Sequence, residues 1–179
     1  MLKNNKGEKV EEEKKALIKE NKKTDKQKIL LIIVVAAIVI IDQVSKIIVI
    51  NKGEITIIPQ VLSFKVTQNT NAAYGIGSNS TVMYVITNLV ILSVIFKFLT
   101  TQNEYVDQKF KIFLSFILAG GIANVIDRVF RGYVVEFIDF KQIINLPVFN
   151  IADLFVLIGW VSVAAIFAHF TFKEWSKKK

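Results

Sequence analysis

The stretch ILLIIVVAAIVIIDQVSKIIVI, residues 29–50, begins with thirteen consecutive apolar residues and then carries Asp42 and Lys46. A membrane-spanning helix needs about 20 predominantly apolar residues, and this stretch has that length. A charged side chain inside a spanning helix costs about 2.5–3.5 kcal/mol on insertion scales, so a charge at such a place marks a candidate functional site. The stretch therefore predicts a transmembrane helix that carries functional polar groups.

The rest of the chain is also rich in apolar residues. Hydrophobic residues make up 53% of its 179 residues and the mean hydropathy is +0.46, more than a soluble domain of this size usually has. Three more stretches, about residues 82–99, 110–130 and 151–172, are long enough to span a membrane. We predict an all-α membrane protein with four transmembrane helices.

Lysine and arginine predict the orientation of these helices. The first 28 residues hold ten, the 97–111 connection three and the C-terminal tail four, against six near the opposite face. Because such residues collect on the cytoplasmic side, both termini should be cytoplasmic. We expect a charged tail over residues 1–28, partly helical or disordered, a membrane domain over 29–172 and a basic tail over 173–179. Because the basic residues behind the net charge of +8 cluster in the tails beside apolar segments, the charge favours a membrane surface over a nucleic-acid partner.

The polar groups of the spans should meet at one depth. With a rise of about 1.5 Å per residue, Asp42 lies about 20 Å and Asn124 about 21 Å from the cytoplasmic end of its helix. Asp127 and Arg128 share the helix face of Asn124, and Asp153 starts the last span at the same level. Independent ion pairs and helix caps would have no reason to gather there. We therefore expect one site in the outer half of the membrane.

Each group also has a purely structural interpretation. An ion pair within one helix, a pair that fixes a helix end and a capping box would account separately for Asp42 with Lys46, Asp127 with Arg128 and Asn150 with Asp153.

The outer loops predict a small β-rich lip over this site. Residues 62–67 alternate apolar and polar side chains, which is typical of a strand with one buried face. Residues 132–140 form a second β-prone segment with Glu136 and Asp139, and residues 69–74 are rich in turn formers. The lip should lie outside the cytoplasm.

Five segments, in this order, resemble the motifs of bacterial lipoprotein signal peptidase, or signal peptidase II: 42-DQVSK-46, 69-NTNAAY-74, 120-GGIANVIDR-128, 134-VVEF-137 and 149-FNIAD-153. The resemblance implies an aspartic-type endopeptidase of the bacterial cytoplasmic membrane, with its active site toward the extracytoplasmic face. Such an enzyme removes the signal peptide from diacylglyceryl-modified prolipoproteins, just before the lipidated cysteine. Its partners would be these substrates and membrane lipids, with no metal, no cofactor and no obligate protein partner.

The same resemblance places the catalytic pair on Glu136 and Asp153. Supporting polar residues would be Asp42, Lys46, Asn69, Asn124, Asp127, Arg128 and Asn150. The family generally has aspartate at the position of Glu136 and glycine at that of Asn71, and commonly glycine at that of Ala123.

Two carboxylates suit a chain with no cysteine and a single histidine. A pair that shares one proton can activate a water with one member and protonate the substrate carbonyl with the other. The macrodipole at the start of a helix favours the ionised form of Asp153 as the base, which leaves the shared proton on Glu136. Arg128 and Lys46 would neutralise the excess acid, while the asparagines could position the substrate backbone.

Two other functions remain possible on these residues. A catalytically inactive relative could bind lipoprotein precursors or a membrane partner, and only the glutamate at position 136 favours it. An ion-conducting bundle would need polar groups at every depth, whereas the inner halves of three spans are nearly all apolar.

The lysine asymmetry gives a prediction of topology. Reporters fused after Lys179 and inserted between Val106 and Asp107 should both lie in the cytoplasm, and one inserted near Gly53 should lie outside. Paired reporters that are active on only one side of the membrane measure this. An outside C-terminus would contradict the common depth of the polar groups.

Overall fold

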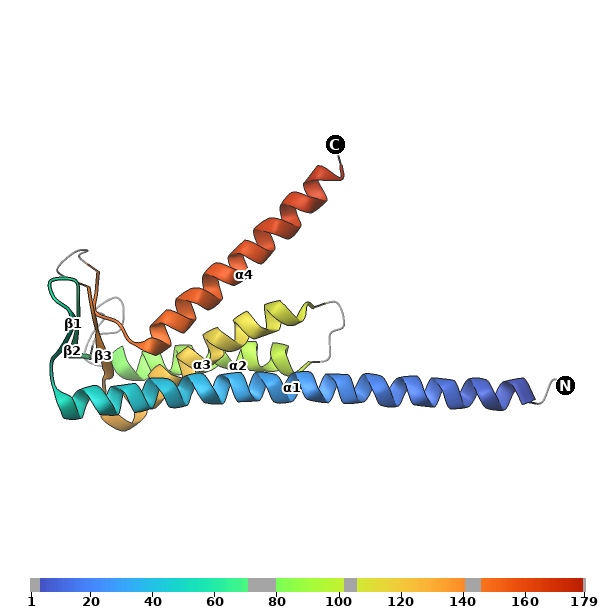
Figure 1. Ribbon diagram of the computed structural model, residues 1–179, viewed down its shortest axis with the longest axis horizontal. Coiled ribbons are helices and arrows are strands. Elements are labelled where there is room, and N and C mark those ends of the chain that lie inside the picture. The colour runs from blue at the N-terminus through green and yellow to red at the C-terminus, as the bar shows by residue number, and fades with distance from the viewer. Residues whose placement is uncertain (1–3, 71–79, 102–105, 141–145, 179) are drawn as a thin grey trace.

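The computed structural model describes residues 4–70, 80–101, 106–140 and 146–178. Its helices are α1 (Asn4–Lys52), α2 (Ser80–Thr100), α3 (Gln108–Arg131) and α4 (Ile151–Ser176), and its strands are β1 (Ile55–Ile58), β2 (Leu62–Asn69) and β3 (Val134–Asp139). Figure 1 shows the strands gathered at one end of the helices. The predicted fold, four helices able to span a membrane with a small sheet, is confirmed.

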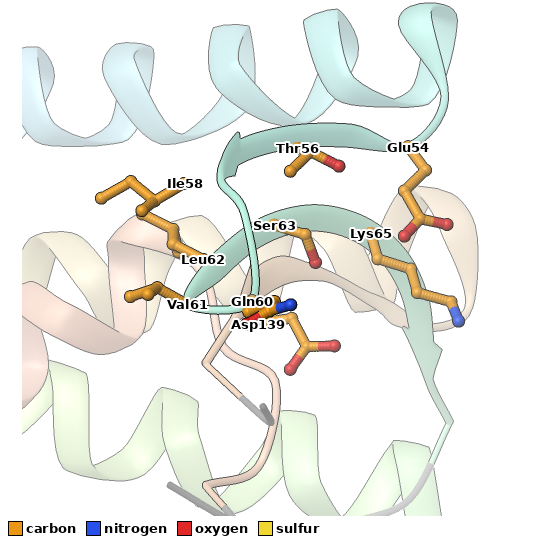
Figure 2. A pocket seen from close by; sticks show the side chains of 9 residues that line it. All are labelled: Glu54, Thr56, Ile58, Gln60, Val61, Leu62, Ser63, Lys65 and Asp139. Carbon is orange, nitrogen blue, oxygen red and sulfur yellow. The ribbon is translucent and has the colours of Figure 1, made fainter. Parts of the chain in front are cut away.

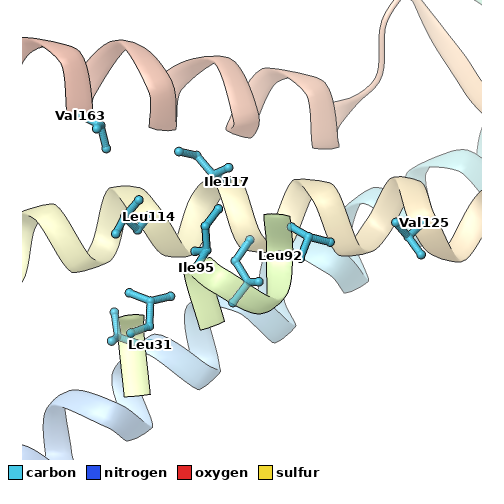
Figure 3. Packing of buried hydrophobic residues seen from close by; sticks show 9 residues of the cluster. Leu31, Leu92, Ile95, Leu114, Ile117, Val125 and Val163 are labelled. Atoms are coloured by element: carbon cyan, nitrogen blue, oxygen red, sulfur yellow. The ribbon is translucent and has the colours of Figure 1, made fainter. Parts of the chain in front are cut away.

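The third helix is the centre of the bundle. In its most apolar window 56% of the residues are buried, against 17–22% in the other three spans. Helices α1, α2 and α4 all pack on α3. Glycines permit this close approach, because a Cβ at Gly121 would lie 2.5 Å from Leu92 and one at Gly120 would clash with Ala152. Figure 3 shows Leu92 and Ile95 on the side of α3 that faces α2, and Ile117 on the side that faces α4.

The first helix is longer than its apolar stretch. It begins at Asn4 and continues without a break through the charged segment into the span. Glu, Lys, Ala and Leu dominate residues 8–20 and are good helix formers, so nothing in this sequence stops the helix before the membrane. In Figure 1 the N-terminal part of α1 projects beyond the other helices.

The sheet is antiparallel, in the order β1-β2-β3. Both predicted β segments form strands, and β2 continues past residue 67 to Asn69, which pairs with Val134. The strand β1 follows no alternating pattern and was not predicted from the sequence. Residues 71–74 of the predicted turn lie outside the described residues.

The short connection from α3 to β3 determines where the acidic residues of β3 lie relative to the helices. Gly132 ends α3 in the left-handed conformation, with φ of 80°, which glycine adopts at little cost. The chain then enters β3, where Glu136 lies opposite Thr67. Asp139 pairs with Ser63 instead and lines a separate hollow on the sheet, of about 220 Å³, with Thr56 (Figure 2).

Candidate active site

A buried ammonium group joins the first and third helices. Lys46 Nζ lies 2.7 Å from Asp42 Oδ2 and 2.9 Å from Asp127 Oδ2, and all three side chains are fully buried. The ion pair expected within α1 therefore exists, but it extends to a second helix. Lys46 also donates a hydrogen bond of 3.3 Å to Asn124 Oδ1.

The two carboxylates beside Lys46 hold further elements. Asp42 Oδ1 accepts a hydrogen bond of 2.8 Å from the backbone N–H of Ala152, in the first turn of α4. Asp127 Oδ2 accepts one of 3.0 Å from the N–H of Val135 in β3. Because a buried charge is stable only when it is paired and hydrogen-bonded, these contacts fix α1, α3, α4 and β3 relative to one another.

The purely structural interpretation paired Asp127 with Arg128 at the end of the span. Asp127 Oδ1 is instead in contact with Arg131, one turn later, and accepts a hydrogen bond of 2.9 Å from Gln43 Nε2. Arg128 extends its guanidinium over the ring of Tyr84, 3.6 Å from the ring centroid, and so contacts α2. Residues three and four apart face the same side of a helix, whereas adjacent residues diverge, which explains the exchange of partners.

Asparagine side chains orient Asp153. Asn124 Nδ2 donates to Asp153 Oδ1 at 2.7 Å, and the backbone N–H of Asn150 donates to Asp153 Oδ2 at 3.1 Å. The Asn150 side chain accepts from the N–H of Asp153, which completes the predicted capping box. Asn150 Nδ2 also donates to Asn124 Oδ1 at 3.1 Å and to the carbonyl of Val135 at 3.2 Å. In this structure the asparagines thus hold a carboxylate in place.

Glu136 reaches the same site from the sheet. The side chain is half-buried, and Asn69 Nδ2 donates to Glu136 Oε1 at 2.6 Å. Burial raises the pKa of Glu136 above its usual value, and the charge of Asp153 adds to this. The hydrogen bond from Asn69 and the positive charges of Arg128 and Lys46 act in the opposite direction. Glu136 therefore lies within the electrostatic influence of Asp153 and of both cations.

The structure brings together the residues predicted from the sequence, and it adds three. Gln43 contacts Asp127 and the carbonyl of Ala123, while Arg131 donates to Gln43 Oε1 at 3.0 Å. The spacing of Arg131, four residues after Asp127, could have indicated this pair. Tyr84 has no such local signal, because α2 meets α3 only in the folded chain.

Two departures from the family pattern can be placed. Ala123 is fully buried where α1 and α3 meet, so the added methyl group is accommodated at this contact. Glu136 lies on β3, in the segment where the resemblance to the family leads us to expect an aspartate. Within the described ranges, no group of three or more His, Cys, Asp or Glu side chains is placed to hold a metal ion.

Comparison with known proteins identifies the family to which this fold belongs. Residues 34–170 match the family model described as signal peptidase (SPase) II. The chain is 38% identical over 114 residues to the lipoprotein signal peptidase of Clostridium novyi, which covers 62% of this chain and 76% of that protein. It is 36% identical over 144 residues to that of Enterococcus faecalis, which covers 78% of this chain and 86% of that protein.

A solved structure of a bacterial membrane enzyme is also similar. The similarity has a TM-score of 0.70 at 32% sequence identity, and it covers 84% of this chain and 92% of the other.

Asp127→Asn should lower the free energy of unfolding by about 3–5 kcal/mol, because it leaves Lys46 and Arg131 facing a neutral amide in a buried site. The melting temperature in detergent and the amount of protein in the membrane measure this. Asp25→Asn, the same change at an exposed position of α1, is the matched control and should change neither. Equal melting temperatures for the two variants would show that Asp127 does not hold the bundle.

Proposed function

Because the chain belongs to the signal peptidase II family of aspartic-type membrane peptidases, we propose that it cleaves diacylglyceryl-modified prolipoproteins just before the lipidated cysteine. Its relatives are named lipoprotein signal peptidases, and the family supports the cleavage of lipoprotein signal peptides. The exact cleavage site and the two-carboxylate chemistry of the reaction are our proposals.

Glu136 and Asp153 would form the catalytic pair. The observation that carries this assignment is their convergence: one comes from β3 and the other from the first turn of α4, and the charge of Asp153 raises the pKa of Glu136. Two neighbouring carboxylates ionise together only with difficulty, so such a pair retains one proton. The half-buried Glu136 is the member that would hold it.

Asp153 would be the base. Both of its oxygens accept hydrogen bonds, from Asn124 and from the N–H of Asn150, so its carboxylate has a fixed direction. Its place in the first turn of α4 also puts it near the positive end of the helix dipole, which favours a negative charge by about 0.3–1 kcal/mol. A preoriented base costs little reorganisation during the reaction.

The reaction then proceeds in two steps. Asp153 takes a proton from a water molecule as the water oxygen bonds to the carbonyl carbon, and Glu136 gives its proton to the carbonyl oxygen. The C–N bond of the resulting gem-diol breaks as Asp153 returns its proton to the leaving nitrogen. Glu136 recovers a hydroxyl proton, so the pair ends with the single proton with which it began. The products are a signal peptide with a free carboxyl group and a lipoprotein whose cysteine has a free amine.

The inactive-relative hypothesis receives less support. It was favoured only by the longer side chain at position 136. In the structure this side chain accepts a hydrogen bond from Asn69, and the charge of Asp153 raises its pKa, both of which are compatible with a working pair. The sheet end of the bundle, with the pair, would face the outside of the cytoplasmic membrane if both termini are cytoplasmic.

Variants of the three outer carboxylates test the pair in a cleavage assay on a lipidated precursor. Asp153→Asn and Glu136→Gln should each lower the rate by about 10²–10⁴-fold with the protein still in the membrane, because each removes a proton-transfer group. Glu136→Asp should retain part of the activity. Asp139→Asn is the matched control on the same strand and should be nearly silent, since Asp139 lines the separate hollow with Thr56 and Ser63.

Three outcomes would contradict this assignment. Full activity of Asp153→Asn would exclude the pair. A normal rate for Glu136→Gln with a dead Asp139→Asn would move the proton donor to Asp139. A wild-type protein that binds the lipidated precursor but never cuts it would favour the binding function.

The pH profile tests the protonated state of Glu136. Activity should fall as the pH rises through the raised pKa of Glu136, because the proton donor is then lost. Asn69→Ala removes a donor that stabilises the ionised form, so the pKa should rise further and the alkaline limb of kcat/KM should move to higher pH. Gln68→Ala, at the exposed neighbouring position, should leave the limb in place. A limb that moves to lower pH in Asn69→Ala would contradict this role of Glu136.

A further inference from the structure

A second cavity lies between α1 and α2, on the part of the bundle away from the sheet. Its volume is about 390 Å³, and its lining is almost entirely apolar, with Leu31, Val35, Phe96, Leu99, Leu118 and Ile122 among its residues. It exists because α1 and α2 both pack on α3 but make little contact with each other. The two helices form its walls, and α3 forms its floor.

One charged side chain lines this groove. Lys28 is half-buried, and its ammonium group makes no ion pair or hydrogen bond within the part of the chain that the structure describes. A lysine stem packs well on apolar surface, but its ammonium group needs water or an anion. The groove therefore has at one end a cation that no described residue pairs with.

The position of Lys28 relative to the apolar walls matches the layout of a lipid. Lys28 directly precedes the apolar stretch of the first span, at the level where headgroups lie. From Lys28 to Ala36 the wall of α1 runs eight residues into the span, about 12 Å at about 1.5 Å per residue. A phosphate at Lys28 would thus place an acyl chain along the groove.

The positive charge at this end of the groove favours an anionic lipid as its occupant. Lys26 on α1, Lys97 in the last turn of α2 and Lys109 in the first turn of α3 belong to the same end of the bundle. The signal peptide of a substrate is a second possible occupant of the groove. It begins with a positively charged segment, which these lysines would repel. Basic pockets between transmembrane helices suit anionic headgroups.

We propose that this groove binds an anionic phospholipid, with one acyl chain between α1 and α2 and the phosphate paired with Lys28. The site is separate from Glu136 and Asp153 and does not depend on the proposed reaction. It would give the protein a lipid that stays bound when the surrounding lipids exchange.

Native mass spectrometry of the full-length protein tests this site. The protein is equilibrated with mixed vesicles of phosphatidylglycerol and phosphatidylcholine, and the lipid retained by each variant is counted. Wild type should retain one phosphatidylglycerol in preference to phosphatidylcholine. Lys28→Gln should lower this retention about fivefold, because one lysine near a lipid phosphate contributes about that much affinity. Ala36→Phe should lower it as well, by filling the groove from α1.

Lys26→Gln is the matched control, because it removes the same charge from an exposed position of the same helix. It should retain phosphatidylglycerol as wild type does. Equal retention by Lys26→Gln and Lys28→Gln, or equal retention of the two lipids, would overturn the site. An Ala36→Phe variant that keeps its phosphatidylglycerol but has a higher KM for a lipidated precursor would assign the groove to the signal helix instead. In the absence of phosphatidylglycerol, Lys28→Gln and wild type should cleave a lipidated precursor at the same rate. A loss of lipid retention in Lys28→Gln can then be told apart from damage to the catalytic pair.

Discussion

The buried ammonium group of Lys46, between the carboxylates of Asp42 and Asp127, is the contact on which the rest of the structure depends. Removing such charges from water costs several kcal/mol for each ion, and only close pairing with further hydrogen bonds recovers this cost. The two carboxylates find these bonds on the backbone of Ala152 and Val135. Satisfying one buried cation therefore places the start of α4 and the strand β3 against α1 and α3. These are the elements that carry Asp153 and Glu136.

Charge balance connects this framework to the chemistry. Four carboxylates, those of Asp42, Asp127, Glu136 and Asp153, share the site with three cations, Lys46, Arg128 and Arg131. One carboxylate is in excess, so a single proton would neutralise the group. A pair of carboxylates that shares one proton needs this balance, and Glu136, whose pKa is raised by burial and by Asp153, is the acid suited to hold it.

The two ends of the bundle differ because of how the helices pack on α3. Near the sheet, α1, α3 and α4 are tied together by buried polar contacts. Farther along, α1 and α2 make little contact and leave an apolar groove with Lys28. Polar contacts in a membrane bind helices at specific points, whereas purely apolar faces pack against lipid nearly as well as against each other. The proposed active site at one end of the bundle and the proposed lipid site at the other are consistent with this difference.

The sequence by itself determined the features that depend on short distances along the chain. Span length follows from apolar runs, the Asp42–Lys46 pair from a spacing of four, and the capping box of Asn150 and Asp153 from a spacing of three. Even the common level of the polar groups along the bundle follows from counting residues along each helix. Only the tertiary structure decided the partners across elements: Lys46 with Asp127, Arg128 with Tyr84, and Asn124 with Asp153. These partners are set by which helix faces meet, and a contact between faces of separate helices leaves no periodic mark in either sequence.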